Sequence, residues 1–277
     1  LRKGAVGIVV DQAWRGNASN FSAPVIRIFD LYNKVSQIAS TFYENPSKKI
    51  RTIATTGTNG KTSCCWLLSD LLTRLGKKSA YLGTLGCVIG GSRADGMSAS
   101  EVVKTSLTTP DAVTIQAILK RLSNAGVSSV ALEASSHALA QKRIDAVSVD
   151  TAIFTNLSRD HLDYHGDMKS YGASKTLLFQ KPELQTIIIN IDDDFSAVLA
   201  GKIASHKQIY RYSLDNNKAD IYCTSIELDP LGVTAEVVTP WGLGTIKSSL
   251  VGQFNLSNLL AVVAAAATKI PLFDVLG

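Results

Sequence analysis

The sequence predicts an α/β protein with a mostly parallel sheet flanked by helices, and three observations lead to that prediction. Short apolar runs alternate with helix-like stretches from Arg51 to Asp192. A glycine turn at residues 57–60 joins one of these runs to a helix, as in phosphate-binding loops. Polar residues close three of the runs, where parallel sheets bind their ligands, and these residues are Glu133, Asn156 and Asn190.

Residues 1–48 are expected to form a partial N-terminal α/β domain, ahead of a central domain at 49–277. The expected elements of the first part are strands at 5–10 and 24–29 and an amphipathic helix from about Asp30 to Tyr43. The segment ENPSKKI has a proline and a basic pair, which is typical of a linker. This linker sets the expected boundary.

The central part contains the alternating elements. The predicted strands are residues 51–55, 79–85, 127–133, 149–156 and 186–192. The predicted helices begin after Lys61 and lie at about 113–125 and 171–179. After about Ile221 we expect a small hairpin region, with turns at DPLG and PWGLG, and a closing helix that begins near Asn255.

The composition limits the classes of binding partner and the cellular compartment that we expect for this protein. The chain has 28 Lys+Arg and 23 Asp+Glu dispersed along it, so its net charge of +5 favours anionic small molecules over nucleic acid. The four cysteines form no C-x-x-C pair and no zinc spacing, which is typical of reduced cytosolic thiols, and Cys64 and Cys65 are expected to pack a helix. The longest apolar run, Leu259–Ala267, is too short to span a bilayer. We therefore expect a cytoplasmic monomer without membrane or nucleic-acid partners.

The glycine turn predicts a phosphate site. Backbone N–H groups from Gly57 to Gly60 and the start of the next helix would face a phosphate, with Lys61 on the terminal phosphate and Thr62 on Mg²⁺. The match to G-x-x-x-x-G-K-[ST] is imperfect, because Thr55 stands at the first glycine. The alternative is a plain glycine turn with a solvated lysine.

The segment EASSH, Glu133 to His137, permits three interpretations. A carboxylate at a strand end beside a phosphate loop could bind Mg²⁺, or it could be a helix N-cap partner. Ser135 or Ser136 with His137 could form a nucleophile pair. Adjacent residues rarely point at each other, and no G-x-S-x-G elbow surrounds them, so this third interpretation is weak.

The segment from Phe154 to Phe179 concentrates titratable groups after a strand. It contains two histidines, three aspartates and lysines in a loop and helix, which a plain connector does not need. Their composition is compatible with metal ligands or with acid–base groups and does not choose between them.

Five segments together carry a family resemblance. TGTNGKTS, SLTTPD, EASSHALAQKR, the segment 154–179 and GQFNLSNLLA resemble the Mur ligases, in the same order and context, from Ile50 to Leu276. The likeness is greatest to the members that add the third peptide residue to UDP-N-acetylmuramoyl-L-Ala-D-Glu. It implies that ATP phosphorylates a carboxylate, and that the amine of an amino acid, meso-diaminopimelate rather than L-lysine, attacks the acyl phosphate.

The resemblance implies roles for individual residues. The ATP loop would be Gly57, Thr58, Asn59, Gly60, Lys61, Thr62 and Ser63, and Asn258 would contact adenine. Thr62 and Glu133 would hold one Mg²⁺, and His161 with a carbamylated Lys175 would hold another. The substrate contacts would be Thr108, Thr109, Ser135, Gln141 and Arg143. The plainer alternatives are a solvated helix lysine for Lys175 and helix capping for Asn255 and Asn258.

The resemblance also implies missing parts. Both ends of the chain look cut, since it starts at Leu1 and stops after a helix-like segment. We expect residues 1–48 to be the remnant of a UDP-muramoyl-binding domain and the amino-acid-binding domain to lie beyond Gly277. Two other functions stay open: a module that binds ATP or the UDP-linked peptide without turnover, and a ligase similar to folylpolyglutamate synthase.

Overall fold

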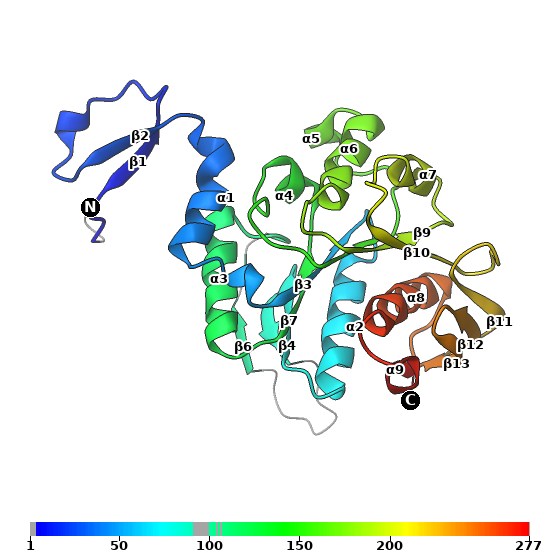
Figure 1. Ribbon diagram of the computed structural model, residues 1–277. Helices are drawn as coiled ribbons and strands as arrows, with labels where there is room; N and C mark the ends of the chain where they lie inside the picture. The colour runs from blue at the N-terminus through cyan, green and yellow to red at the C-terminus, as the bar shows by residue number, and fades with distance from the viewer. Residues whose placement is uncertain (1–3, 91–99, 104, 106, 277) are drawn as a thin grey trace.

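The computed structural model describes residues 4–90, 100–103, 105 and 107–276. Its main feature is an eleven-stranded sheet in the order β13-β12-β11-β10-β9-β8-β3-β7-β4-β5-β6 (Figure 1). The strands from β4 to β11 in that order run parallel, and antiparallel strands extend both edges. The predicted α/β class with a mostly parallel sheet is therefore confirmed.

The strand bounds follow the apolar runs. The parallel strands are β3 Arg51–Thr56, β4 Ser79–Gly83, β7 Ser129–Glu133, β8 Thr151–Phe154, β9 Thr186–Asn190, β10 Gln208–Ser213 and β11 Ile221–Asp229. The antiparallel strands are β5 Gly86–Ile89, β6 Ser100–Val103, β12 Gly232–Thr239 and β13 Gly242–Ser248. The predicted hairpins are present, but they continue the main sheet and are not a separate region, because β11 pairs with β10 as well as with β12. The sequence pattern missed β5, β6 and β10.

Helices cover both faces of the sheet. One face carries α2 Lys61–Arg74, α8 Gln253–Ala267 and α9 Leu272–Leu276. Against the other pack α3 Ala112–Asn124, α4 Ser136–Ala140, α6 Met168–Phe179 and α7 Phe195–Ala200, while the short α5 Leu162–His165 lies against α6. Successive strand residues point to opposite faces, so Ile53 enters the first core and Ala54 the second. Among the described residues, no helix is both long and apolar enough to cross a membrane.

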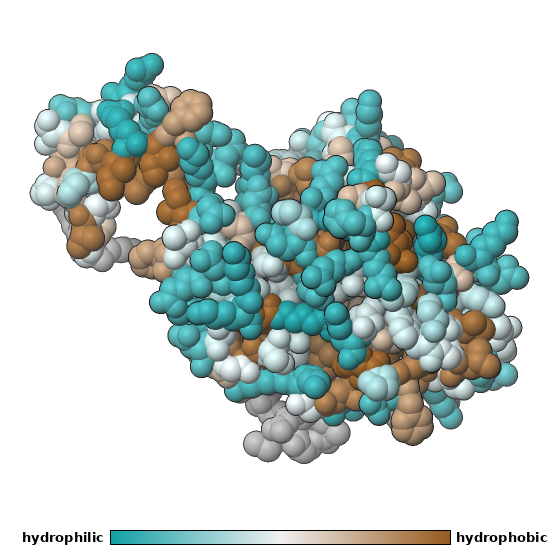
Figure 2. Space-filling view, in the orientation of Figure 1, coloured by the Kyte–Doolittle hydropathy of each residue, from teal (hydrophilic) through white to brown (hydrophobic). Residues whose placement is uncertain are grey.

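The N-terminal part forms its own small sheet. The strands β1 Ile8–Asp11 and β2 Val25–Ile28 pair in parallel, with a 3₁₀ turn, η1 Ala18–Asn20, between them. The helix α1 Leu31–Phe42 and a second 3₁₀ turn, η2 Pro46–Lys48, lead to β3, and α1 packs against α3 (Figure 1). Apolar side chains gather on the small sheet (Figure 2), among them the exposed Val9 and Ile26. The strands and helix expected here are present, and the domain boundary at 48 stays a prediction.

Candidate functional site

The glycine loop between β3 and α2 is shaped by its neighbours. A Cβ on Gly57 would lie 1.9 Å from the Thr155 hydroxyl oxygen, and one on Gly60 would lie 2.4 Å from Asn258 Oδ1. Gly60 also has a φ of +84°, which side-chain-bearing residues rarely adopt. The N–H of Asn59 donates to Asn156 Oδ1 at 2.9 Å, which fixes the loop to the end of β8. The loop is therefore a rigid turn in which both glycines are required.

Lys61 opens α2 and folds back over this loop. Its ammonium donates to the carbonyls of Gly57 at 2.9 Å and Thr58 at 2.8 Å. Burial lowers the pKa of Lys61, and the nearby carboxylate of Glu133 limits that fall. Lys61 is half-buried and its ammonium is held by two loop carbonyls, so it is not a freely solvated lysine. That the turn binds phosphate stays a prediction.

Thr62 and Glu133 meet beside the loop. The Thr62 hydroxyl donates to Glu133 Oε2 at 3.0 Å, although the two residues are 71 positions apart. Glu133 is fully buried at the carboxyl end of β7. Its interpretation as a helix cap is wrong, because the Ser135 hydroxyl caps α4 by accepting from the Ala138 N–H. Two oxygen groups of this kind are the donors that Mg²⁺ prefers.

Lys175 reaches the loop from α6. Its side chain is 1% exposed, and its amine donates to the Gly57 carbonyl at 2.8 Å, the same oxygen that Lys61 contacts. The amine also lies 4.4 Å from the centre of the Tyr171 ring. Burial, reinforced by the charge of Lys61, lowers the pKa of Lys175 from 10.5 to about 6. The alternative of a solvated helix lysine is therefore wrong.

His161 belongs to a cluster of rings beside these lysines. It has a φ of +51° at the start of α5, and its ring centre lies 4.8 Å from that of His137. His137 in turn lies 4.2 Å from the Tyr164 ring and 5.4 Å from the His165 ring. Burial, followed by repulsion from His161 and Arg143, lowers the pKa of His137. The sequence pattern gave no sign that three of the four histidines would meet here.

A serine–histidine contact does occur, but with a different histidine from the one considered. His165 Nε2 lies 3.0 Å from the Ser136 hydroxyl, whereas His137 faces the other rings. Burial lowers the pKa of His165, and repulsion from His137 and Lys175 adds to the shift. Ser136 is buried at the start of α4. The Ser135 hydroxyl accepts from the Ala138 N–H and lies beside the Thr109 hydroxyl, so neither serine forms the predicted pair with His137 among the described contacts.

The predicted substrate residues surround the end of β7. The Thr109 hydroxyl donates to the Glu133 carbonyl at 2.7 Å and lies 3.1 Å from the Ser135 hydroxyl. Arg143 donates through Nη1 to the Thr109 carbonyl at 2.7 Å and through Nε to Gln141 Oε1 at 2.9 Å. Gln141 donates to the Tyr164 hydroxyl at 3.1 Å. These contacts prearrange the Arg143 guanidinium without giving it an acidic partner among the described residues.

One pocket of about 250 Å³ collects most of these groups. Its lining includes Lys61, Thr108, Thr109, Ser135, His137, Arg143, His161, Tyr171 and Lys175. It combines cationic and hydroxyl groups from the segments that follow β3, β7 and β8, from the loop before α3 and from α6. They lie at the carboxyl edge of the sheet, where parallel sheets bind ligands. Within the described part of the chain, no three His, Cys, Asp or Glu side chains converge as a preformed metal site.

The remaining predicted residues lie behind the loop or beside it. Ser63 is in the first turn of α2, next to the loop. Asn258 is buried in α8, where its amide oxygen lies close to Gly60 and 3.5 Å from the Cys64 sulfur. Helix capping by the two asparagines is wrong, because α8 begins at Gln253 after Gly252, and Asn255 instead bonds the Val251 carbonyl.

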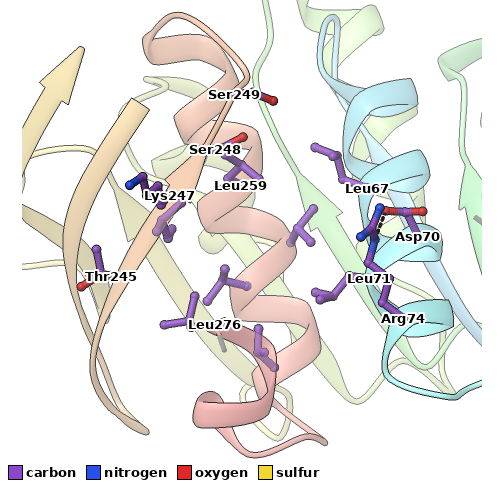
Figure 3. A pocket seen from close by; sticks show the side chains of 14 residues that line it. Leu67, Asp70, Leu71, Arg74, Thr245, Lys247, Ser248, Ser249, Leu259 and Leu276 are labelled. Atoms are coloured by element: carbon purple, nitrogen blue, oxygen red, sulfur yellow. Dashed lines mark hydrogen bonds and ion pairs between the residues drawn. The ribbon is translucent and has the colours of Figure 1, made fainter. Parts of the chain in front are cut away.

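A larger pocket of about 440 Å³ lies elsewhere, between α2, α8 and β13 (Figure 3). Its walls are mostly aliphatic, including Leu67, Leu71 and Leu259, and the Asp70–Arg74 ion pair borders it. It is lined by the half of α2 farther from the phosphate loop and by no residue predicted from the sequence. The candidate site is therefore the smaller pocket.

The glycine loop, the helix that follows it and the carboxyl edge of the parallel sheet define a P-loop nucleotide-binding protein. Comparison with known protein families identifies which family of nucleotide-binding proteins the chain belongs to. Residues 55–266 match the family described as "Mur ligase middle domain", and the chain belongs to the Mur ligases.

Individual relatives agree with this family. The chain is 42% identical over its whole length to the UDP-N-acetylmuramoyl-L-alanyl-D-glutamate--2,6-diaminopimelate ligase of Pseudomonas aeruginosa, covering 55% of that protein. It is 40% identical to the ligase of the same name from Coxiella burnetii, over 87% of the chain and 48% of that protein. The chain thus spans about half the length of the curated relatives it matches.

Solved structures agree as well. A structure of a ligase of the same name has a TM-score of 0.83 at 28% identity, covering 98% of this chain and 58% of that one. A folylpolyglutamate synthase of Mycobacterium tuberculosis has a TM-score of 0.68 at 16% identity, covering 88% of this chain and 61% of that one. At that identity, the second likeness shows a common fold alone.

Proposed function

We propose that the chain is the nucleotide-binding part of an ATP-dependent ligase that adds meso-diaminopimelate to UDP-N-acetylmuramoyl-L-Ala-D-Glu. The observation that carries this proposal is the pocket in which Lys61, Lys175 and Arg143 come together with the hydroxyls of Thr109 and Ser135. Such a site suits two anions, a nucleotide phosphate and a carboxylate. The names of the relatives support this choice of substrates.

The ATP phosphates would bind at the start of α2. The first N–H groups of a helix have no partner within the helix, and no side chain caps α2 at Gly60. Those groups can therefore donate to phosphate oxygens, with the helix dipole adding to the attraction. Lys61 would exchange its contacts with the Gly57 and Thr58 carbonyls for contacts with phosphate.

Thr62 and Glu133 fit a Mg²⁺ ion, because a hydroxyl and a buried carboxylate meet beside the phosphate loop. His161 and Lys175 line the candidate pocket together with Lys61 and would hold a second ion, with Lys175 carbamylated. Carbamylation joins the amine nitrogen to CO₂ with loss of a proton, so it requires a neutral amine. A pKa of about 6 keeps Lys175 mostly neutral at pH 7. Bound Mg²⁺ neutralises the charge that gathers between the phosphates and the carboxylate.

The substrate carboxylate would lie near Arg143, Thr109 and Ser135. One carboxylate oxygen attacks the γ-phosphorus and ADP leaves. The amine of diaminopimelate then attacks the acyl carbon, phosphate leaves, and the amide forms after loss of a proton. The residues of this chain orient the two anions and keep them close, which lowers the entropic cost of the encounter. A reducing, cytoplasmic compartment fits this activity, since all four cysteines are free and buried.

The test is phosphate release by the full-length protein that contains this chain. With ATP, Mg²⁺ and UDP-N-acetylmuramoyl-L-Ala-D-Glu, we expect turnover when meso-diaminopimelate is added and little with L-lysine. Lys175→Ala should lower turnover by about 100-fold or more, while Lys169→Ala, an exposed lysine on the same helix, should not. ATP hydrolysis without amide formation, or indifference to the UDP-linked dipeptide, would contradict the proposal.

A further inference from the structure

Glu133 is held by more than the phosphate loop. Its Oε1 accepts from the Tyr81 hydroxyl and from the Thr84 N–H at 3.0 Å. Its Oε2 accepts from the hydroxyls of Thr62 at 3.0 Å and Thr84 at 3.2 Å. Only Thr62 belongs to the phosphate-loop helix, so three of these four contacts come from β4 and the turn that follows it.

The turn between β4 and β5 fits closely around this carboxylate. A Cβ on Gly83 would lie 2.2 Å from Glu133 Oε1, so the backbone can approach only because this residue is glycine. The Leu85 N–H donates to the Tyr81 hydroxyl oxygen at 3.1 Å, which ties the turn to β4. The Tyr81 ring is 1% exposed and packs edge-on against Trp66 of α2, with centres 5.5 Å apart. The hydroxyl of Tyr81 thus cannot move away unless the core opens.

Thr84 also connects the carboxylate to the pocket. Its hydroxyl lies 3.2 Å from that of Thr108, which lines the pocket together with Arg143 and Lys175. A carboxylate bonded through both oxygens keeps one orientation, and partners of this kind tune the metal affinity of the group that they hold.

We propose that Tyr81 and Thr84 are positioning residues, which orient Glu133 for a divalent cation and couple it to Thr108 on the substrate side. This inference rests on the proposed function, because it deepens the role given there to Glu133. A purely structural role would have another result: replacing Tyr81 would lower stability and leave metal affinity unchanged.

The experiment measures Mn²⁺ binding to the full-length protein that contains this chain, in the presence of ATP, by electron paramagnetic resonance. Tyr81→Phe and Thr84→Val each remove one hydroxyl and keep the size of the side chain. Both should weaken Mn²⁺ binding by about 10-fold or more, whereas ATP binding without metal, measured by calorimetry, should not change.

Two further variants act as controls. Thr84→Ser restores a hydroxyl and should bind Mn²⁺ within about threefold of the wild type. Tyr212→Phe removes a hydroxyl from an equally buried tyrosine of β10, outside the pocket, and should not alter binding. If Tyr81→Phe does not fold, the comparison of Thr84→Val with Thr84→Ser still tests whether the hydroxyl affects Mn²⁺ binding.

The possible failures can be told apart. If the wild type binds ATP and Mn²⁺, and Tyr81→Phe and Thr84→Val bind Mn²⁺ equally well, the inference is wrong and the proposed function stands. If the wild type binds neither ATP nor Mn²⁺, the proposed function is itself wrong, and the inference falls with it.

Discussion

Two lysines donate to one carbonyl oxygen, that of Gly57. Two full positive charges at one acceptor repel each other strongly in a site with little water. Burial, reinforced by the charge of Lys61, lowers the pKa of the more buried lysine, Lys175, to about 6. At neutral pH the Lys175 amine is then mostly neutral and nucleophilic.

Lys175→Met should change how stability depends on pH. Between about pH 6 and pH 10.5 the folded chain holds Lys175 neutral, while the unfolded chain holds it charged. The unfolded state then binds more protons, so this lysine raises the free energy of unfolding as pH rises, by up to about 1.4 kcal/mol per pH unit. Below about pH 6 the cost of the buried charge is fully present.

Urea unfolding in CO₂-free buffer, without metal, measures this effect. Lys175→Met should be the more stable protein at the acidic end of the window, and its advantage should shrink towards alkaline pH. Parallel pH profiles for the two proteins would show that the amine is not held neutral in the folded chain.

Arg143→Lys should weaken substrate binding selectively. The planar guanidinium bonds the Thr109 carbonyl and Gln141 at once, a fork that an ammonium cannot reproduce. We expect the KM for the UDP-linked dipeptide to rise by about 10-fold or more, which corresponds to the loss of one charged hydrogen bond. The affinity for ATP, measured by calorimetry, is the internal control, and an equal loss of both affinities would contradict this assignment.

At the scale of elements, the phosphate loop depends on close contact with its neighbours. Gly60→Ala should abolish ATP binding, because the added Cβ would lie 2.4 Å from Asn258 Oδ1 on α8. Gly76→Ala is the matched control, since Gly76 has a similar φ of +74° and open space around it. Both changes should cost about 1 kcal/mol of backbone strain, but only the first should affect ATP binding in a calorimetric titration.

The helix α6 places its functional residues through its own periodicity. Asp167 caps its first turn by accepting from the Ser170 N–H, which is why the helix begins at Met168 and not near Tyr171. Tyr171 and Lys175 are four residues apart and therefore share a face, so the ring lies under the amine. This spacing was visible in the sequence, and it could have marked Tyr171 as part of the site.

At the scale of the whole molecule, the sheet separates two cores. Leu260 of α8 lies in one and Leu119 of α3 in the other, and both are 0% exposed. Each change to alanine should lower the free energy of unfolding by about 2–5 kcal/mol. Because both cores share the same strands, we expect one cooperative transition in thermal unfolding. Leu231→Ala, on a residue that is 84% exposed, is the control. Two separate unfolding transitions, with the midpoint temperature of each lowered by only one of the two variants, would contradict the prediction that both cores unfold together.

Much of the fold could be predicted from the pattern of apolar residues along the chain. The strands that this pattern missed were missed for physical reasons. The strands β3, β7, β8 and β9 are apolar runs with both faces buried, which sequence periodicity detects. In contrast, β10 mixes polar and apolar residues. The strand β5 is only four residues long and lies between β4 and β6 in the sheet. Such strands form because a neighbouring strand offers hydrogen bonds, and a single sequence does not reveal that neighbour.

The sequence by itself determined the α/β class, the phosphate loop and the likeness to the Mur ligases, because these depend on periodicity and on residue types at fixed spacing. Only the tertiary structure decided which groups share the pocket. Lys175 reaches the Gly57 carbonyl across 118 positions, and Thr62 reaches Glu133 across 71. Burial at the first meeting point lowers the pKa of Lys175. At the second, hydrogen bonds from Thr62, Tyr81 and Thr84 hold both oxygens of Glu133. Both effects require that the layers pack, which no local stretch of sequence encodes.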